Sequence, residues 1–164
     1  MNTNTMNLPT GQAGAPVIEP MIGEKKNILG HTVTVKLRSS EAADNYVFEV
    51  VTPPGLGIPP HSHTEEDEVI YVQSGIFEVM IGEEVFTAEA GAWLNFKRPL
   101  PHGFRNIGNM PGKTLWFVDP GKKFEAFFDE LGNFPPGPPD LATVSALFAK
   151  YGMTRPGGVT TSKT

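Results

Sequence analysis

The chain has 164 residues with a formal net charge of −5 at pH 7, no cysteine, 18 glycines and 16 prolines. This length suffices for one domain with a single hydrophobic core. The acidic balance, with no cluster of lysine and arginine, argues against nucleic acid or a membrane surface as the main partner. Without cysteine, no disulfide or thiolate metal site can form. The frequent glycines and prolines indicate many turns, as in an all-β domain.

The N-terminal residues 1–16 are polar and rich in Asn, Thr, Gly and Pro. We expect them to form a flexible tail. They contain no positive cluster followed by an apolar run, so no secretory signal is predicted. No segment is apolar for long enough to cross a bilayer. These features predict a cytoplasmic protein.

Short segments of alternating polar and apolar residues follow, as in half-buried strands. The segment 31–37, for example, places three apolar residues on one face. The predicted strands are 17–22 (an edge strand or arm), 31–37, 46–51, 69–72, 76–81, 84–88, 92–96, 103–107 and 114–118. Residues 52–60, TPPGLGIPP, are interpreted as a loop. Gly82 begins a two-residue loop that suits a type II′ hairpin turn. Strands at this spacing predict a sandwich or barrel.

Two helices are predicted after the last strand. Phe124, Phe127 and Phe128 share one face of a helix over 123–131, which we interpret as core packing against the barrel rather than a cofactor contact. Asp140 can cap a second helix over about 141–151. The expected buried face of this helix contains Leu141, Val144, Leu147, Phe148 and Tyr151. The predicted divisions are a tail (1–16), a barrel (17–122), a helical extension packing on the barrel (123–152) and a second flexible tail (153–164).

Chemistry-bearing residues concentrate in residues 61–68, HSHTEEDE. Residues i and i+2 of a strand point to the same face, so His61 and His63 would together supply half of a metal site. His102 adds a third imidazole at the start of another strand. A polar loop with two chance histidines is the alternative reading of this stretch. The fourth histidine, His31, is interpreted as a surface or packing residue.

Four carboxylates follow the histidine pair. Asp67 and Glu68 open the next strand and are better placed to reach a metal than Glu65 or Glu66. The glycine spacing then favours one of them. Gly55, five residues, His61-Ser-His63, four residues, Glu68, six residues and Gly75 resemble the first cupin motif at every fixed position. This match leaves Glu65, Glu66 and Asp67 as expected loop or surface residues.

The second cupin motif is also recognisable. Gly91, His102 and Asn106 stand at its fixed positions. Lys97 replaces the usual proline and Pro99 the usual glycine, and both departures lie in the turn rather than among the ligands. The resemblance spans about residues 33–117.

The resemblance implies an all-β double-stranded β-helix, the jelly-roll or cupin barrel, with short C-terminal helices outside it. It implies one divalent transition metal ion (Fe, Mn, Ni, Co, Cu or Zn) whose ligands are His61, His63, Glu68 and His102. Glu68 would also accept a substrate proton. The C-terminal segment is similar to that of small single-domain cupins, some of which resemble quercetin 2,3-dioxygenase.

The implied function is therefore a metal-dependent dioxygenase acting on a small aromatic or enolic substrate. A non-oxidative cupin isomerase, cyclase or lyase and a ligand-binding cupin without turnover are the alternatives. A small molecule is the expected partner, together with a second copy of the chain, because small cupins are often homodimers. Alternation along the strands predicts an apolar pocket. Its expected lining residues are Phe48, Ile70, Phe77, Val79, Phe104 and Trp116.

Overall fold

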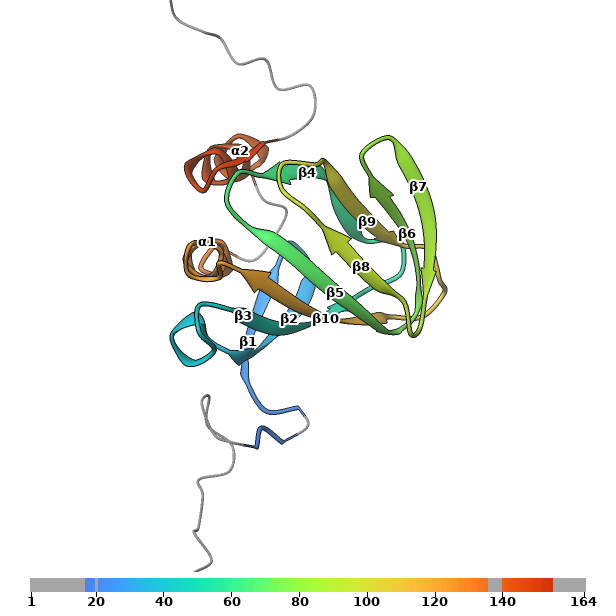
Figure 1. Ribbon diagram of the computed structural model, residues 1–164, viewed down its shortest axis with the longest axis horizontal. Helices are drawn as coiled ribbons and strands as arrows, with labels where there is room; N and C mark the ends of the chain where they lie inside the picture. Colours follow the sequence, from blue (N-terminus) through green and yellow to red (C-terminus); the bar gives the residue numbers. More distant parts are fainter. Residues whose placement is uncertain (1–16, 20, 136–139, 155–164) are drawn as a thin grey trace, which may run out of the picture.

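The computed structural model describes residues 17–19, 21–135 and 140–154. Two antiparallel sheets face each other and curl into a barrel, and two helices lie beside one of its ends (Figure 1). This arrangement confirms the predicted jelly-roll fold with short C-terminal helices. In the described part of the chain, neither helix is long and apolar enough to cross a membrane.

The first sheet has the strand order β1-β2-β3-β10-β5-β8 among the described residues. Its strands are β1 (Glu24–Ile28), β2 (His31–Leu37), β3 (Tyr46–Thr52), β10 (Gly112–Asp119), β5 (Asp67–Ser74) and β8 (Trp93–Phe96). A short 3-10 turn, Ser39–Glu41, joins β2 to β3. Within this sheet, Glu68 of β5 lies opposite Val118 of β10 and Phe96 of β8.

The second sheet has the order β11-β4-β9-β6-β7. Its strands are β11 (Met153–Thr154), β4 (Gly57–His63), β9 (His102–Asn106), β6 (Ile76–Ile81) and β7 (Glu84–Glu89). His61 of β4 lies directly opposite His102 of β9. The β6–β7 hairpin turns at Gly82, whose φ of 64° is the left-handed conformation required of the first loop residue in a type II′ turn.

Strand β4 differs from the loop expected before His61. Its pairing with β9 is irregular between Ile58 and His61. Pro59 and Pro60 lie within this irregular part, where their lack of an N–H donor removes no regular ladder hydrogen bond. The two prolines therefore explain why the sequence pattern predicted a loop where the structure has a strand.

The N-terminal edge also differs from expectation. The described residues of 17–22 form a bend and a turn instead of a strand, with Met21 at a φ of 64°. The first strand is β1, whose charged sequence EKKNI has no alternating apolar pattern. The remaining predicted strands lie within two residues of the observed ones at each end. The expected tail 1–16 lies outside the described residues.

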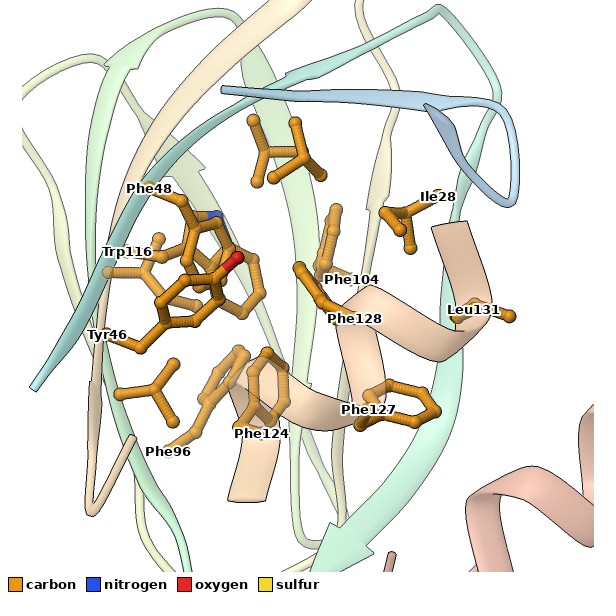
Figure 2. Packing of buried hydrophobic residues seen from close by; sticks show 14 of the residues in the cluster. Ile28, Tyr46, Phe48, Phe96, Phe104, Trp116, Phe124, Phe127, Phe128 and Leu131 are labelled. Carbon is orange, nitrogen blue, oxygen red and sulfur yellow. The ribbon is translucent and has the colours of Figure 1, made fainter. Parts of the chain in front are cut away.

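The core is rich in aromatic side chains that come from both the barrel and the first helix, α1 (Lys122–Gly132) (Figure 2). Phe48 of β3 is stacked between Trp116 of β10 and Phe124 of α1, at ring-centroid distances of 5.8 and 6.0 Å. Tyr46 and Phe128 extend this cluster. The phenylalanine stripe of α1 thus packs against the barrel, as the sequence predicts.

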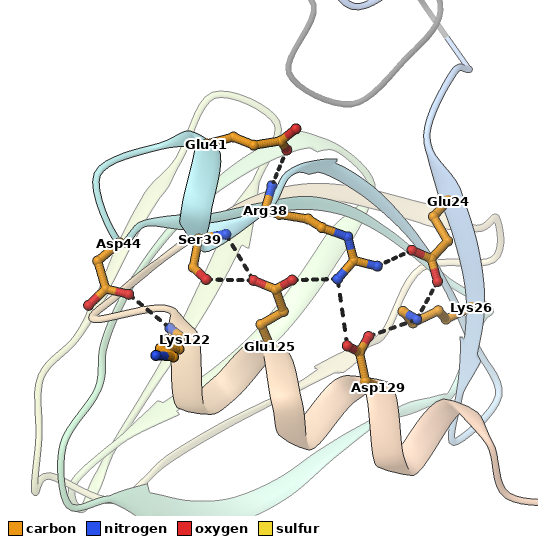
Figure 3. A network of polar contacts seen from close by, with 9 residues as sticks. All are labelled: Glu24, Lys26, Arg38, Ser39, Glu41, Asp44, Lys122, Glu125 and Asp129. Carbon is orange, nitrogen blue, oxygen red and sulfur yellow. Dashed lines mark hydrogen bonds and ion pairs between the residues drawn. The ribbon is translucent and has the colours of Figure 1, made fainter.

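Polar contacts fix α1 to the first sheet (Figure 3). The carboxylate of Glu125 accepts hydrogen bonds from the backbone N–H and the hydroxyl of Ser39, at 2.8 and 2.7 Å, and pairs with Arg38. Asp129 pairs with Lys26 of β1 at 2.9 Å. These contacts hold the helix across the sheet edge, which fixes the position of its phenylalanines.

The second helix, α2 (Leu141–Lys150), begins as predicted, because the Asp140 carboxylate accepts a hydrogen bond from the Thr143 N–H at 2.9 Å. Its buried residues are Val144, Leu147 and Phe148, whereas Leu141 is 70% exposed and departs from the expected face. The first two residues of the expected C-terminal tail form β11, which pairs with β4. The rest of that tail, 155–164, lies outside the described residues.

His31 is a buried packing histidine and gives a pH-dependence prediction. Its Nδ1 shares a hydrogen bond of 3.1 Å with the Thr52 hydroxyl, and burial lowers its pKa to about 4. Because the unfolded chain protonates His31 near pH 6.5, stability is complete above that pH and falls as pH decreases towards 4. We expect a loss of about 3 kcal/mol from this residue. Urea unfolding across this pH range should show a smaller decrease in a His31→Gln variant.

Candidate metal centre

Three imidazoles from two neighbouring strands meet inside the barrel. His61 and His63 point to the same side of β4, and the antiparallel pairing with β9 brings His102 beside them. The three residues are buried, and one ring nitrogen of each lies within 4.8 Å of the others. Ligand atoms about 2.1 Å from a shared ion are roughly 3 to 4 Å apart. Small side-chain shifts therefore suffice for the three histidines to bind one ion.

Glu68 reaches the same centre from the opposite sheet. Its carboxylate oxygens lie 3.6 Å from Nε2 of His63 and 3.3 Å from Nε2 of His102. Burial raises the pKa of Glu68, but the surrounding imidazoles of His63, His102 and His61 outweigh this effect and hold the pKa at about 2. The carboxylate is therefore an anion at neutral pH, as a metal ligand must be.

Backbone carbonyl groups orient two of the three rings. Nδ1 of His61 lies 3.1 Å from the Pro59 carbonyl oxygen, and Nδ1 of His102 lies 2.9 Å from that of Leu100. A hydrogen on each Nδ1 satisfies these contacts and leaves the Nε2 lone pair free for a cation. Burial also lowers the pKa of His61 to about 4, so its ring is neutral at pH 7.

Several buried polar atoms in this centre have no partner among the described residues. They include Nε2 of His63, Nε2 of His102 and one carboxylate oxygen of Glu68. Such atoms are rare in folded proteins and call for an explanation. A divalent cation bound by these atoms would satisfy all of them at once. Three imidazoles and one carboxylate suit Fe, Mn, Co, Ni, Cu or Zn and select none of these metals.

The acidic residues next to the histidine pair differ sharply in burial. Glu65 is exposed and pairs with Lys123, and Asp67 is partly buried and accepts a hydrogen bond from the Arg98 N–H. Glu66, expected at the surface, is only 1% exposed. One of its oxygens lies 3.5 Å from Nδ1 of His63. Three consecutive acidic residues look alike in the sequence, and only the path of the loop turns the middle one inward.

Aromatic rings enclose the imidazole cluster. Phe96 is stacked on His102 at a centroid distance of 4.4 Å, and Phe124 of α1 lies 5.6 Å from His63. Phe148 of α2 lies 6.0 Å from His61. The helices outside the resemblance therefore supply part of the wall around this centre.

A small apolar cavity of about 50 Å³ adjoins the centre. His61 and Glu68 contribute to its wall, together with phenylalanines of α1 and α2. Of the residues expected to line a pocket, Phe104 and Trp116 do so. The others, Phe48, Ile70, Phe77 and Val79, are buried in the core and are not among the lining residues of this cavity.

A larger groove of about 510 Å³ lies on the outer face of β4, β9, β6 and β7. The main chain at Gly57 and Gly103 and the side chains of Met80 and Val85 form much of its lining. Neither the three clustered histidines nor Glu68 contribute to it. The small cavity, not this groove, is therefore the space next to the candidate metal ligands.

The barrel is similar to one known family of domains. The family model of the cupin domain matches residues 48–118, which contain all four candidate ligands. The match covers less than half of the chain, so it shows that the barrel is similar to cupin domains.

Two curated relatives are protein SchB of Streptomyces halstedii and polyketide synthase CurC of Streptomyces cyaneus. Each is 28% identical to this chain over 79 residues, which are 48% of this chain and 57% and 51% of the relatives. The chain thus spans about half the length of the curated relatives it matches.

Solved cupin structures show the same fold. An RmlC-like cupin from Shewanella frigidimarina has a TM-score of 0.57 and 16% identity, covering 67% of this chain and 95% of that protein. The polyketide cyclase RemF from Streptomyces resistomycificus has a TM-score of 0.54 and 19% identity, covering 62% and 77%. At these identities the likeness concerns the fold.

Proposed function

We propose that this protein is a metal-dependent cupin enzyme that acts on a small aromatic or enolic compound. The observation that carries the proposal is the cluster of His61, His63, His102 and Glu68 beside an aromatic cavity. Among the described residues, buried polar atoms of His63, His102 and Glu68 have no hydrogen-bond partner. A site with open polar atoms against an apolar wall is typical of catalysis rather than of a closed structural site.

Each part of the site has a distinct role in this proposal. A metal ion held by the three histidines and Glu68 would supply Lewis-acid chemistry at a substrate oxygen. Phe104 and Trp116 contact the apolar body of the substrate, and the helix phenylalanines exclude water. Glu68 accepts a substrate proton. Because a carboxylate bound to a cation is a weak base, Glu68 would gain basicity only when its contact with the cation lengthens.

The cavity must enlarge to admit such a substrate. A cavity that binds benzene has a volume of about 150 Å³, well above the size observed next to the metal ligands. Part of the cavity wall consists of side chains from α1 and α2, which lie outside the barrel. We therefore propose that substrate entry displaces Phe148 and the neighbouring end of α2.

Non-oxidative chemistry, such as cyclisation, is the reaction class that the relatives favour. One relative is named as a polyketide synthase, and the region of 79 matching residues covers about half of this chain. A poly-β-ketone is enolic, and its cyclisation needs a polarised carbonyl and a base but no dioxygen. Turnover that continues under strict anaerobic conditions would support this class.

Dioxygenation is the second candidate, as expected from the resemblance to quercetin 2,3-dioxygenase-like cupins. The enclosed aromatic surroundings of the three histidines support it, because they exclude water from reactive intermediates. Oxygen uptake with flavonols or catechols that depends on the bound metal would favour dioxygenation. Stoichiometric ligand binding without conversion would instead indicate a binding protein.

The metal itself can be tested before any substrate is known. We expect purified wild-type protein from metal-replete cells to contain about one transition metal ion per chain, because three imidazoles and a carboxylate suffice to hold one ion. His63→Ala should contain far less. Elemental analysis of both proteins provides the measurement. Equal metal contents would contradict the proposed function.

A further inference from the structure

We propose that Glu66 is a positioning residue for the metal ligand His63, forming a carboxylate–imidazole–metal triad. The inference rests on the proposed metal centre and adds a residue to it from outside the ligand set. Glu66 is 1% exposed, and neither of its oxygens has a hydrogen-bond partner among the described residues. A carboxylate buried in this way is costly unless a nearby group uses its charge.

The two nitrogens of the His63 ring face two different carboxylates. Nδ1 lies 3.5 Å from Glu66, and Nε2 lies 3.6 Å from Glu68. Glu66 is therefore on the outer side of the ring, and the metal would bind on the inner side. A hydrogen bond from Nδ1–H to Glu66 would direct the lone pair of Nε2 towards the metal and increase its basicity. A contraction of a few tenths of an ångström would bring this contact within ordinary hydrogen-bond length.

The other two histidines show why His63 needs such a partner. His61 and His102 each lie within hydrogen-bond distance of a main-chain carbonyl oxygen two residues earlier in the chain. Neither nitrogen of His63 has a hydrogen-bond partner among the described residues. Glu66 is the group that faces its Nδ1. An anionic acceptor increases ligand basicity more than a neutral carbonyl does, so His63 would be the most strongly donating of the three imidazoles.

The loop that carries Glu66 is held on both sides. The Thr64 N–H donates to the Gly152 carbonyl oxygen at 3.2 Å, and Glu65 pairs with Lys123 at 2.7 Å. Asp67 accepts a hydrogen bond from the Arg98 N–H at 3.0 Å. With its neighbours fixed, Glu66 is directed towards His63 before any metal arrives. Such pre-positioning is what an outer-shell partner requires.

Zinc affinity of the full-length protein tests the proposal. Competition with a chromophoric chelator should show affinity for Zn²⁺ about 10- to 100-fold weaker in Glu66→Ala than in the wild type. Glu66→Gln, which keeps a neutral acceptor, should lie between the two. Glu84→Ala is the control, since Glu84 is an exposed carboxylate on the edge strand β7, and its affinity should equal that of the wild type.

Two further measurements separate positioning from a purely structural role. Urea unfolding of the metal-free proteins should show Glu66→Gln at least as stable as the wild type, because the amide removes a buried charge without changing the shape. In the zinc-loaded wild type, NMR of the ring nitrogens should show a protonated His63 Nδ1 with a strongly deshielded proton. That proton should shift upfield in Glu66→Gln, an effect that loss of packing would not produce.

The outcomes distinguish this inference from the proposed function. If Glu66→Ala and Glu66→Gln bind zinc as tightly as the wild type while His63→Ala does not, the positioning role is wrong and the metal centre stands. If the wild type binds zinc no better than His63→Ala, both are wrong. Loss of zinc affinity together with an equal loss of metal-free stability in Glu66→Gln would also overturn the positioning role.

Discussion

Glu68→Gln is expected to weaken metal affinity by more than about 100-fold, a larger effect than outer-shell changes alone produce. The substitution preserves the shape of the side chain and removes the negative charge that lies next to Nε2 of His63 and Nε2 of His102. Glu68 lies between His63 and His102, so no other described carboxylate can replace it as a ligand without movement of the loop. Chelator competition with Zn²⁺ and Co²⁺ measures the change.

Asp67→Asn is the matched control for this prediction. Asp67 precedes Glu68 in β5 but points outward, where it accepts a hydrogen bond from the Arg98 N–H and pairs with Lys97. Asparagine retains the acceptor, and surface substitutions of this kind usually change free energies by less than about 0.5 kcal/mol. Its metal affinity should therefore remain within about twofold of the wild type. Equal losses in both variants would mean that Glu68 acts through general charge rather than as a ligand.

The histidine cluster could be predicted because it depends on local strand geometry and on the pairing of two strands, β4 and β9. Strand alternation places His61 and His63 on the same face. The position of His102 required the resemblance to a known family, since the distance along the chain says nothing about which strands pair. The structure supplies this link by placing His102 opposite His61.

Other features depend on tertiary packing that no local pattern encodes. The start of β4 was predicted as a loop because of its prolines. The irregular pairing there accommodates prolines that a regular strand would not. Glu66 resembles its neighbours in the sequence and is buried only by the path of its loop. The α1 stripe was predictable as an apolar face. Its contact with the metal centre through Phe124 depends on how the helix crosses the sheet.

Phe124→Ala is expected to lower the free energy of unfolding by about 3 to 5 kcal/mol, the range typical of buried phenylalanines. Phe124 is stacked on Phe48 of the barrel and contacts Phe127 and Phe128 within its own helix. Its removal leaves a cavity where helix and barrel meet, and the anchored position of α1 limits how far the site can collapse. Urea denaturation of the metal-free protein, with an unchanged m-value, measures the loss.

Phe86→Ala provides the comparison, because Phe86 lies on the edge strand β7 and is 45% exposed. A side chain with this exposure has less apolar area to lose, so the variant should lose less than about 1.5 kcal/mol. Phe124 also lines the small cavity beside His61 and Glu68, so Phe124→Ala should admit a small apolar probe that the wild type excludes. Similar losses in the two variants would show that α1 does not close the barrel. A large loss of unfolding free energy in Phe124→Ala alone would show that the wall around the metal centre also stabilises the fold.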